Sequence, residues 1–175
     1  MRHDKIRKNL MDHGDDRSKH VIAFHDHHLP EMLTATGSSG NHHFWQGGYY
    51  DHISDCFSLA HRMWMTLSHR TSEFGLCNIF YVLYFHDIEK LWKYGNIESE
   101  LKCPPNDVGK EVFYMEELPS CWNIWFTDDE LNALKYIHGE GQDYSKTQRI
   151  MCQLAGFCHA VDILSARTWP EMKML

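Results

Sequence analysis

The dipeptide His86-Asp87 is the feature of this sequence that places the strongest demand on its surroundings. It follows the apolar run 79–85, so an imidazole and a carboxylate are expected in an apolar wall, where unpaired polar groups are costly. Both groups then need partners, or their pKa values must shift. A divalent metal ion would neutralise the carboxylate and accept the lone pair of the imidazole. Because adjacent residues on a helix point about 100° apart, the two side chains would bracket one ion or serve two.

Two further residues could complete a ligand set with this dipeptide. His52 lies in a helical stripe of apolar residues that includes Cys56, so its ring is expected to face the core. Asp162 lies among small residues on the last long helical segment, where there is room for an ion. The alternatives are structural roles, with His52 as a helix cap and Asp162 neutralised by Arg167 or by backbone groups. The sequence therefore predicts a site for one or two divalent metal ions, built from nitrogen and oxygen ligands on several segments.

The segments that must position these residues are all predicted to be helical. Apolar periodicity or helix-start signals occur in residues 51–67, 76–92, 106–118, 127–138 and 145–169. Two segments open with a capping box, Thr127 to Glu130 and Ser145 to Gln148. Strand signals are poor throughout, since no alternating run is followed by a convincing hairpin turn. We therefore expect an all-α bundle of about five to seven helices.

The chain is expected to form one domain with a polar N-terminal arm. Residues 1–40 are predicted to be an arm or lid, and residues 41–175 the helical core. Residues 1–28 are dense in charge and histidine with weak periodicity, so we expect them to be loosely held. The cluster His25-Asp26-His27-His28 could bind a metal or act in a lid, but consecutive histidines in a polar arm more often reflect exposure.

Charge and composition exclude several classes of protein. The formal net charge of −7, without a clustered basic surface, argues against binding of duplex nucleic acid, while a small anionic substrate stays compatible. The longest apolar run is too short to span a bilayer. Six cysteines without a C-x-x-C pair, and no secretory signal, indicate reduced thiols. We expect a cytoplasmic, soluble protein of any source, bacterial or phage included, with homo-oligomerisation left open.

The order of the candidate ligands resembles a known signature. His52, His86-Asp87 and Asp162 follow the H…HD…D order of the HD superfamily of metal-dependent phosphohydrolases. Residues 42–52 (HHFWQGGYYDH) look like the H-H-x-x-x-G-G-x-x-x-H motif of a branch with 3′→5′ exonuclease-like members. Residues 85–90 (FHDIEK) look like the H-D-I-G-K element of many HD enzymes.

The resemblance continues toward the C-terminus. Residues 137–139 (IHG) and 159–162 (HAVD) are similar to the later His-Gly and H-x-x-D elements of that branch, so the resemblance spans about residues 41–169. Glu89 departs from it, because this position is usually Gly. Lys90 stands where the HD 5′-nucleotidases have a Glu, which weakens assignment to that subgroup.

The resemblance and the residue chemistry together imply a set of roles. His43 and His138 could be further ligands or could orient other groups, His138 or Glu89 could accept a proton from water, and Lys90 is expected to contact a substrate phosphate. His138 and the lysines could instead be a helix-end imidazole and solvated surface charges. His159 could support Asp162 or be an ordinary core residue. Candidate metal ligands are His52, His86, Asp87, Asp162, His138 and His43; candidate catalytic residues are Asp87, Lys90, His138 and Glu89; further phosphate contacts are Lys93, Lys135 and Arg149.

The activity that follows is metal-assisted hydrolysis of a small phosphorylated substrate, expected to be a nucleotide with a phosphomonoester, triphosphate or phosphodiester bond. Mn, Fe, Co, Ni, Zn and Mg all suit such ligands. An HD-type diiron oxygenase and a non-catalytic metal-binding interaction module are the alternatives.

Overall fold

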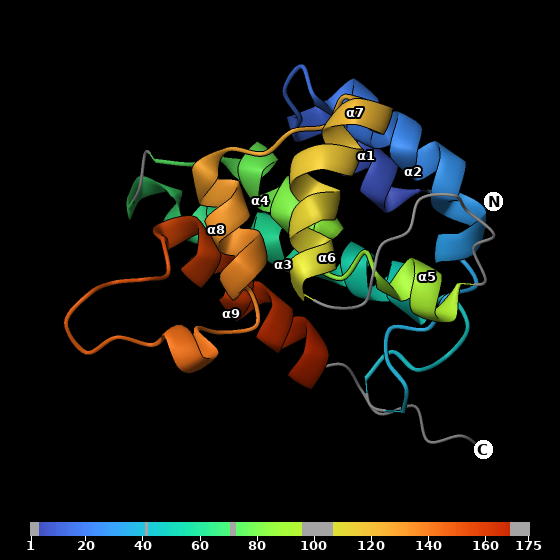
Figure 1. Cartoon of the computed structure of the whole chain (residues 1–175). Coiled ribbons are helices and arrows are strands. Elements are labelled where there is room, and N and C mark those ends of the chain that lie inside the picture. Colours follow the sequence, from blue (N-terminus) through green and yellow to red (C-terminus); the bar gives the residue numbers. More distant parts are fainter. Residues whose placement is uncertain (1–3, 41, 71–72, 96–106, 169–175) are drawn as a thin grey trace.

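The computed structural model of the chain is all-α, as the sequence predicts (Figure 1). It describes residues 4–40, 42–70, 73–95 and 107–168, and none of these residues is in a strand. The helices are α1 (Lys5–His13), α2 (Ser18–Met32), α3 (Gly48–Leu67), α4 (Leu76–Phe85), α5 (Lys90–Tyr94), α6 (Asp107–Val112), α7 (Leu118–Trp122), α8 (Asp128–Tyr136) and α9 (Gln153–Thr168). Short 3₁₀ turns occur at Ser68–Arg70 and Gly141–Asp143, and a π-helical turn at Phe113–Glu117 joins α6 to α7.

Helix α4 runs through the middle of the molecule and packs against α3, α8 and α9 (Figure 1). Residues 79–85 of this helix are all buried, in agreement with the apolar wall expected before His86-Asp87. Because α4 is surrounded, the residues that follow it emerge inside the protein. This position brings His86-Asp87 into contact with the neighbouring helices.

The helix predicted over residues 76–92 is interrupted after Phe85. The N–H groups of Ile88, Lys90 and Leu91 donate to the carbonyls three residues earlier, at 3.1, 2.9 and 3.1 Å, so the chain winds more tightly than an α-helix before α5 begins. The prediction of one continuous helix was therefore wrong. His86 and Asp87 lie in a turn, and their side chains need not diverge by the angle that an α-helix would impose.

Residues 4–32 form two helices that belong to the core, in contrast to the loosely held arm expected from the sequence. Ile6 and Leu10 of α1, and Val21 and Phe24 of α2, are buried. The apolar periodicity of α2 is weak because histidines occupy two of its buried positions. Such polar residues hide the buried face from a search for apolar stripes.

The two predicted capping boxes had different outcomes. Thr127 and Glu130 form a complete capping box at the start of α8, as predicted. Ser145 accepts a hydrogen bond from the N–H of Gln148 at 3.1 Å, but no helix follows, and α9 begins at Gln153. Asn132 of α8 binds backbone groups of this segment, donating to the Ile150 carbonyl at 3.0 Å and accepting from the Cys152 N–H at 2.9 Å. These contacts hold residues 150–152 in a non-helical conformation.

Two other helix boundaries differ from the prediction. α3 begins at Gly48, three residues before the predicted start at Asp51, and its N-cap Gly47 has a left-handed φ of 76°. The segment expected to be helical over residues 106–118 continues through Pro119 to Trp122, and a π-helical turn at Phe113–Glu117 precedes the proline.

None of the described helices is long and apolar enough to span a membrane. The cysteines within the described residues are free thiols, and Cys103 lies outside those residues.

Candidate metal centre

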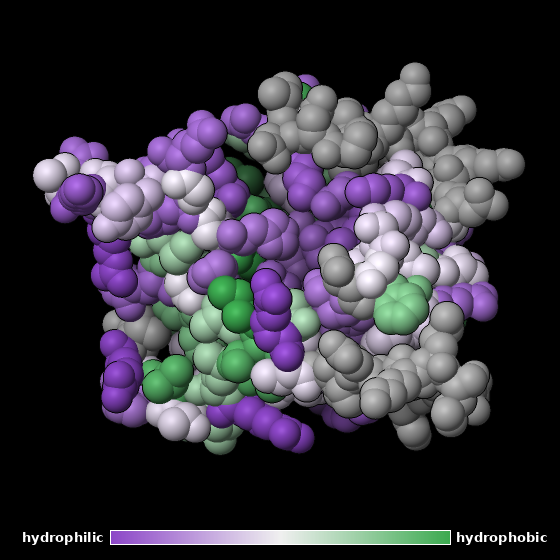
Figure 2. Space-filling view, turned by 90° about the horizontal axis from the view of Figure 1, so that it is seen from below, coloured by the Kyte–Doolittle hydropathy of each residue, from purple (hydrophilic) through white to green (hydrophobic). Residues whose placement is uncertain are grey.

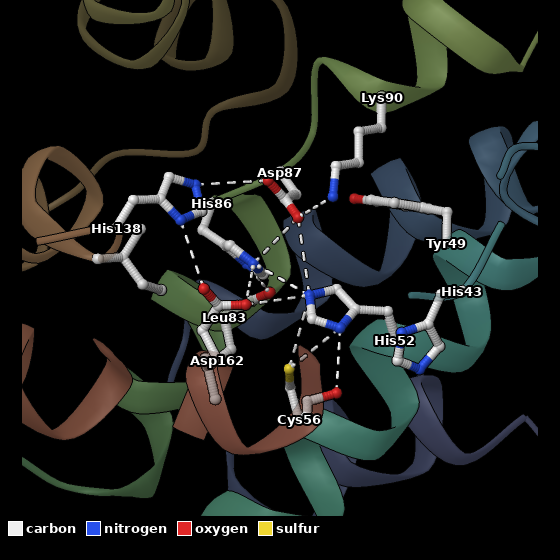
Figure 3. A network of polar contacts seen from close by, with 12 residues as sticks. His43, Tyr49, His52, Cys56, Leu83, His86, Asp87, Lys90, His138 and Asp162 are labelled. Atoms are coloured by element: carbon white, nitrogen blue, oxygen red, sulfur yellow. Dashed lines mark hydrogen bonds and ion pairs between the residues drawn. The ribbon is translucent and has the colours of Figure 1, made fainter. Parts of the chain in front are cut away.

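The structure brings four of the predicted ligands to one point (Figure 3). His52 comes from α3, His86 and Asp87 from the turn after α4, and Asp162 from α9. His52 Nε2 lies 3.3 Å from His86 Nε2 and 3.3 Å from Asp162 Oδ1. Asp87 Oδ2 lies 3.3 Å from His86 Nε2 and 3.6 Å from His52 Nε2, and Asp162 Oδ1 lies 3.5 Å from His86 Nε2. Four donor atoms from three distant parts of the chain thus converge within the protein.

The spacing of these four atoms suits a metal ion. Ligands bound to an ion at 2.0–2.2 Å in a tetrahedron are separated from each other by roughly 3.3–3.6 Å, and the His–His and His–carboxylate distances of the cluster lie in this range. His86 Nδ1 donates to the Leu83 carbonyl at 2.8 Å, which leaves the lone pair of Nε2 directed into the cluster. His52 Nδ1 lies 3.0 Å from the hydroxyl of Ser165, which orients the second ring in the same manner. These residues therefore fit a divalent cation, and the donor atoms of His52, His86 and Asp87 lie close enough together to hold one.

The two buried carboxylates of the cluster also need a positive charge close to them. All four side chains are buried. Burial opposes ionisation of Asp87, yet His86, His138 and Lys90 hold its pKa well below the ordinary value. Burial likewise disfavours a charged His86 ring, but Asp87 and Asp162 raise its pKa to about 10, whereas burial lowers the pKa of His52. A divalent cation would provide the same compensation as a protonated His86 ring.

His138 lies on the other side of the two carboxylates. Its Nε2 is 3.5 Å from Asp87 Oδ1 and its Nδ1 is 3.3 Å from Asp162 Oδ2, so each carboxylate directs one oxygen to the four-donor cluster and the other to His138. The side chain is 53% exposed. Hydrogen bonds to Asp162 and Asp87 raise its pKa. His138 is thus a solvent-accessible imidazole held against both carboxylates.

Lys90 and Glu89 are neighbours in sequence but face different partners. Lys90 Nζ lies 2.5 Å from Asp87 Oδ2, and its side chain is 16% exposed, so it stands at the edge of the cluster. Glu89 Oε1 pairs with Lys110 Nζ of α6 at 2.9 Å. In this arrangement Glu89 is beside the cluster and directed toward α6, which does not support a role as the residue that accepts a proton from water.

The three other candidate phosphate contacts lie on the surface. Lys93 packs over the ring of Tyr94, Lys135 pairs with Asp143 at 2.9 Å, and Arg149 is exposed in the segment before α9. None of these three side chains contacts the four-donor cluster. Among the predicted phosphate contacts, Lys90 is therefore the one that lies beside the cluster.

The histidine pair before α3 lies next to the cluster. His43 is buried, with its ring centroid 5.0 Å from that of His52, and half-buried His42 is 5.6 Å from the same ring. The nitrogens of the three rings come close enough to hold a metal ion as a second group. Burial lowers the pKa of His43 to about 3, with a further contribution from His52, so its ring is neutral and has a lone pair at physiological pH.

Two residues near the cluster were missed by the sequence argument. His42 was not among the predicted ligands, although His43, which also precedes α3, was. Cys56 was treated as an apolar core residue, but its sulfur lies 3.8 Å from His52 Nδ1 and forms a third potential ligand group with His52 and Asp162. The signal for Cys56 was its position one helical turn after His52.

The turn that carries His43 depends on closely packed glycines. His43 has a left-handed φ of 54°, which is uncommon for a non-glycine residue. Its carbonyl accepts a hydrogen bond from Gly37 at 2.7 Å, and a Cβ at Gly48 would lie 2.0 Å from that carbonyl oxygen. The backbone of this turn therefore has no space for a side chain at position 48.

Gly48→Ala is expected to destabilise the protein by about 1–3 kcal/mol, because the new methyl group must displace the backbone at His43. Urea denaturation measures this change. Gly156→Ala is the control, since its Cβ would meet only Met151 Sδ at 3.8 Å inside α9, and it should be neutral or stabilising by up to about 1 kcal/mol. Equal stabilities of the two variants would contradict this account of the turn.

The cluster at residues 25–28 does not form a metal site among the described residues. His25 Nε2 bonds Asp4 at 2.8 Å, and its Nδ1 lies 3.3 Å from the hydroxyl of Tyr84, so both nitrogens have partners. Asp26 pairs with Arg7, while His27 and His28 pack against Trp122. These residues join α1 and α2 to the core.

The face of the molecule seen from below in Figure 1, where the end of α9 lies, has hydrophilic residues gathered near its middle (Figure 2). Comparisons with known proteins add no assignment to this geometry. No protein-family model, no curated protein and no solved structure matches the chain.

Proposed function

We propose that the protein is a metal-dependent phosphohydrolase of the HD type that acts on a small nucleotide. The convergence of His52, His86, Asp87 and Asp162, with His–His and His–carboxylate distances of 3.3–3.6 Å, is the observation that carries this proposal. The order of these residues along the chain, which resembles the HD signature, supports it. A divalent cation bound there would supply an activated water and a Lewis acid for a phosphoryl oxygen.

The residues of the chain divide the remaining work by position. Lys90, at the rim beside Asp87, can hold the negative charge of a phosphate oxygen. His138 is half-exposed and hydrogen-bonds both carboxylates, which favours its protonated form and makes it a suitable proton donor to the leaving oxygen. Asp87 and Asp162 orient this imidazole while their other oxygens face the four-donor cluster.

Metal analysis combined with a hydrolysis screen tests the proposal. The purified protein is stripped with a chelator and reloaded separately with Mn²⁺, Co²⁺, Zn²⁺ or Mg²⁺. It is then assayed on nucleoside mono-, di- and triphosphates, short oligonucleotides and a generic phosphodiester. We expect at least one bound ion per chain and release of a phosphate-containing product that stops on chelation. If the metal-loaded protein turned over none of these substrates, the proposal of a hydrolase would be rejected.

The second candidate is a two-metal oxygenase, and the histidine group next to the cluster favours it. His42, His43 and His52 provide further nitrogen ligands beside the carboxylate site, as a pair of iron ions would require. Two irons per chain and a reaction that consumes oxygen, measured with an oxygen electrode, would distinguish this enzyme from a hydrolase.

Substitution of Lys90 by Gln is expected to raise the KM for a phosphorylated substrate about 10-fold or more, since charge-assisted bonds to an anion contribute about 1.5–3 kcal/mol. Metal content should remain that of the wild type because the four donor atoms are retained. Steady-state kinetics and elemental analysis measure both quantities. Lys5→Gln, at an exposed position on α1, is the control and should leave KM unchanged. An unaltered KM in Lys90→Gln would remove this lysine from the substrate site.

A further inference from the structure

The end of α8 is held by a side chain from α9. α8 ends at Tyr136 with Ile137 as its C-cap, so the last carbonyls of the helix lack helical partners. His159 Nδ1 donates to the carbonyl of Ile137 at 2.5 Å. Gly139 then turns the chain with a φ of 102°, and its N–H donates to the Tyr136 carbonyl at 2.8 Å. His138 is therefore fixed between a side-chain cap and a glycine turn.

The same helix contacts His138 a second time. His159 and Asp162 are three residues apart on α9 and so lie on one face of it. His159 binds the carbonyl that immediately precedes His138, and Asp162 Oδ2 lies 3.3 Å from His138 Nδ1. Two contacts from one face of α9 thus fix both the backbone and the ring of His138. The ring of His159 also lies close to the turn at Gly139, because a Cβ at Gly139 would be 3.7 Å from His159 Cε1.

We infer that His159 is a positioning residue, which holds His138 at its distance from Asp87 and Asp162 through the carbonyl of Ile137. The expected effect of His159 on the rate rests on the proposed function, whereas the bond between His159 and the Ile137 carbonyl does not depend on it. Without this cap, the peptide before His138 is free to rotate toward solvent and to carry the imidazole away from the carboxylates. A displacement of about 1 Å at a reacting group can cost about 100-fold in rate.

Two amide substitutions separate this role from simple packing. His159→Asn places an N–H close to the position of Nδ1 and should retain the bond to Ile137, so its kcat should stay within about 3-fold of the wild type. His159→Gln places its N–H near the position of Nε2 and should lose the bond. Its kcat should fall by about 10- to 100-fold, with the KM and the metal content unchanged. His69→Asn, at an exposed position outside the cluster, is the matched control and should behave as the wild type.

A readout without metal or substrate keeps the inference testable if hydrolysis is never observed. Metal-free proteins are treated with diethyl pyrocarbonate, and the modification of His138 is followed by peptide mapping. We expect His138 to react several-fold faster in His159→Gln than in the wild type, because the ring leaves its carboxylate partners, and at the wild-type rate in His159→Asn. Failure of the hydrolase alone would remove the kinetic effect but leave this difference in reactivity.

Three results would overturn the inference. The first is a His159→Asn variant as impaired as His159→Gln, which would show that the bond to Ile137 is not what matters. The second is wild-type kcat and His138 reactivity in His159→Gln. The third is loss of the metal from His159→Gln, which would make His159 a support for the ligands and not for His138.

Discussion

Asp87→Asn is expected to lower metal content from at least one ion per chain to a small fraction of that value, and to lower hydrolysis on the order of 1,000-fold or more. A metal ion contributes several kcal/mol to the stabilisation of such a transition state, and each 1.36 kcal/mol is a factor of ten in rate. The amide has almost the shape of the carboxylate but lacks its charge. Asp87, like Asp162, directs one oxygen to the four-donor cluster and the other to His138, so its loss affects both sides of the site.

Elemental analysis of the purified variant and a steady-state assay measure these two losses. Asp12→Asn is the matched control, because Asp12 is exposed on α1 and pairs only with Lys8 among the described residues. It should keep the wild-type metal content and rate. Retention of the metal together with full activity in Asp87→Asn would exclude the centre proposed for this protein.

Arg17→Met is expected to destabilise the protein by about 3–5 kcal/mol, since it leaves the buried carboxylate of Glu130 without its charged partner. Arg17 Nη1 lies 2.7 Å from Glu130 Oε2, and Nη2 donates to Oε1 at 3.0 Å. Glu130 is completely buried, and Arg17 is only 6% exposed. The pair joins the start of α2 to the capping box of α8, and the guanidinium also lies 4.6 Å from the ring centre of Tyr81.

Urea or thermal denaturation of the metal-free protein measures this effect without reference to activity. Arg7→Met is the control, because Arg7 pairs with Asp26 at an exposed site where both side chains are more than 40% accessible. Such surface pairs contribute about 0–1 kcal/mol. If both variants lost the same small amount of stability, the Arg17 pair would not be an anchor between the N-terminal helices and the core.

The sequence predicted the fold class and the positions of the principal side chains for a physical reason. Burial of a continuous apolar segment such as 79–85 forces the next residues into the interior, so a His and an Asp at positions 86 and 87 had to find partners there. The capping box at Thr127 was also readable because both of its hydrogen bonds are local.

Other features depend on contacts between distant parts of the chain. The start of α9 was misplaced because Asn132 binds the backbone at residues 150–152, and a local capping pattern at Ser145 cannot report that contact. The break after Phe85 also involves contacts between distant parts of the chain. The turn there places His86 and Asp87 together, next to polar partners on α3 and α9. The buried face of α2 was hidden by the histidines that occupy two of its positions.

The proximity of His42 to the cluster lies beyond a helical-spacing argument, whereas that of Cys56 to His52 follows from their spacing on α3 and only its proximity to Asp162 does not. His42 precedes α3, in a turn whose path is set by close packing against Gly37 and Gly48. That path cannot be derived from periodicity. Cys56 was recognised as a core residue, but its neighbour Asp162 is separated from it by most of the chain.

The wide separation of the ligands along the chain has a consequence for the order of folding. His52 is on α3, whereas Asp162 and the hydroxyl of Ser165 that orients His52 are on α9. A growing polypeptide is synthesised at about 5–20 residues per second, and its earlier helices can pack before α9 has been made. The group of candidate ligands is therefore complete only when the last described helix docks, and an ion bound at that moment would stabilise the finished topology.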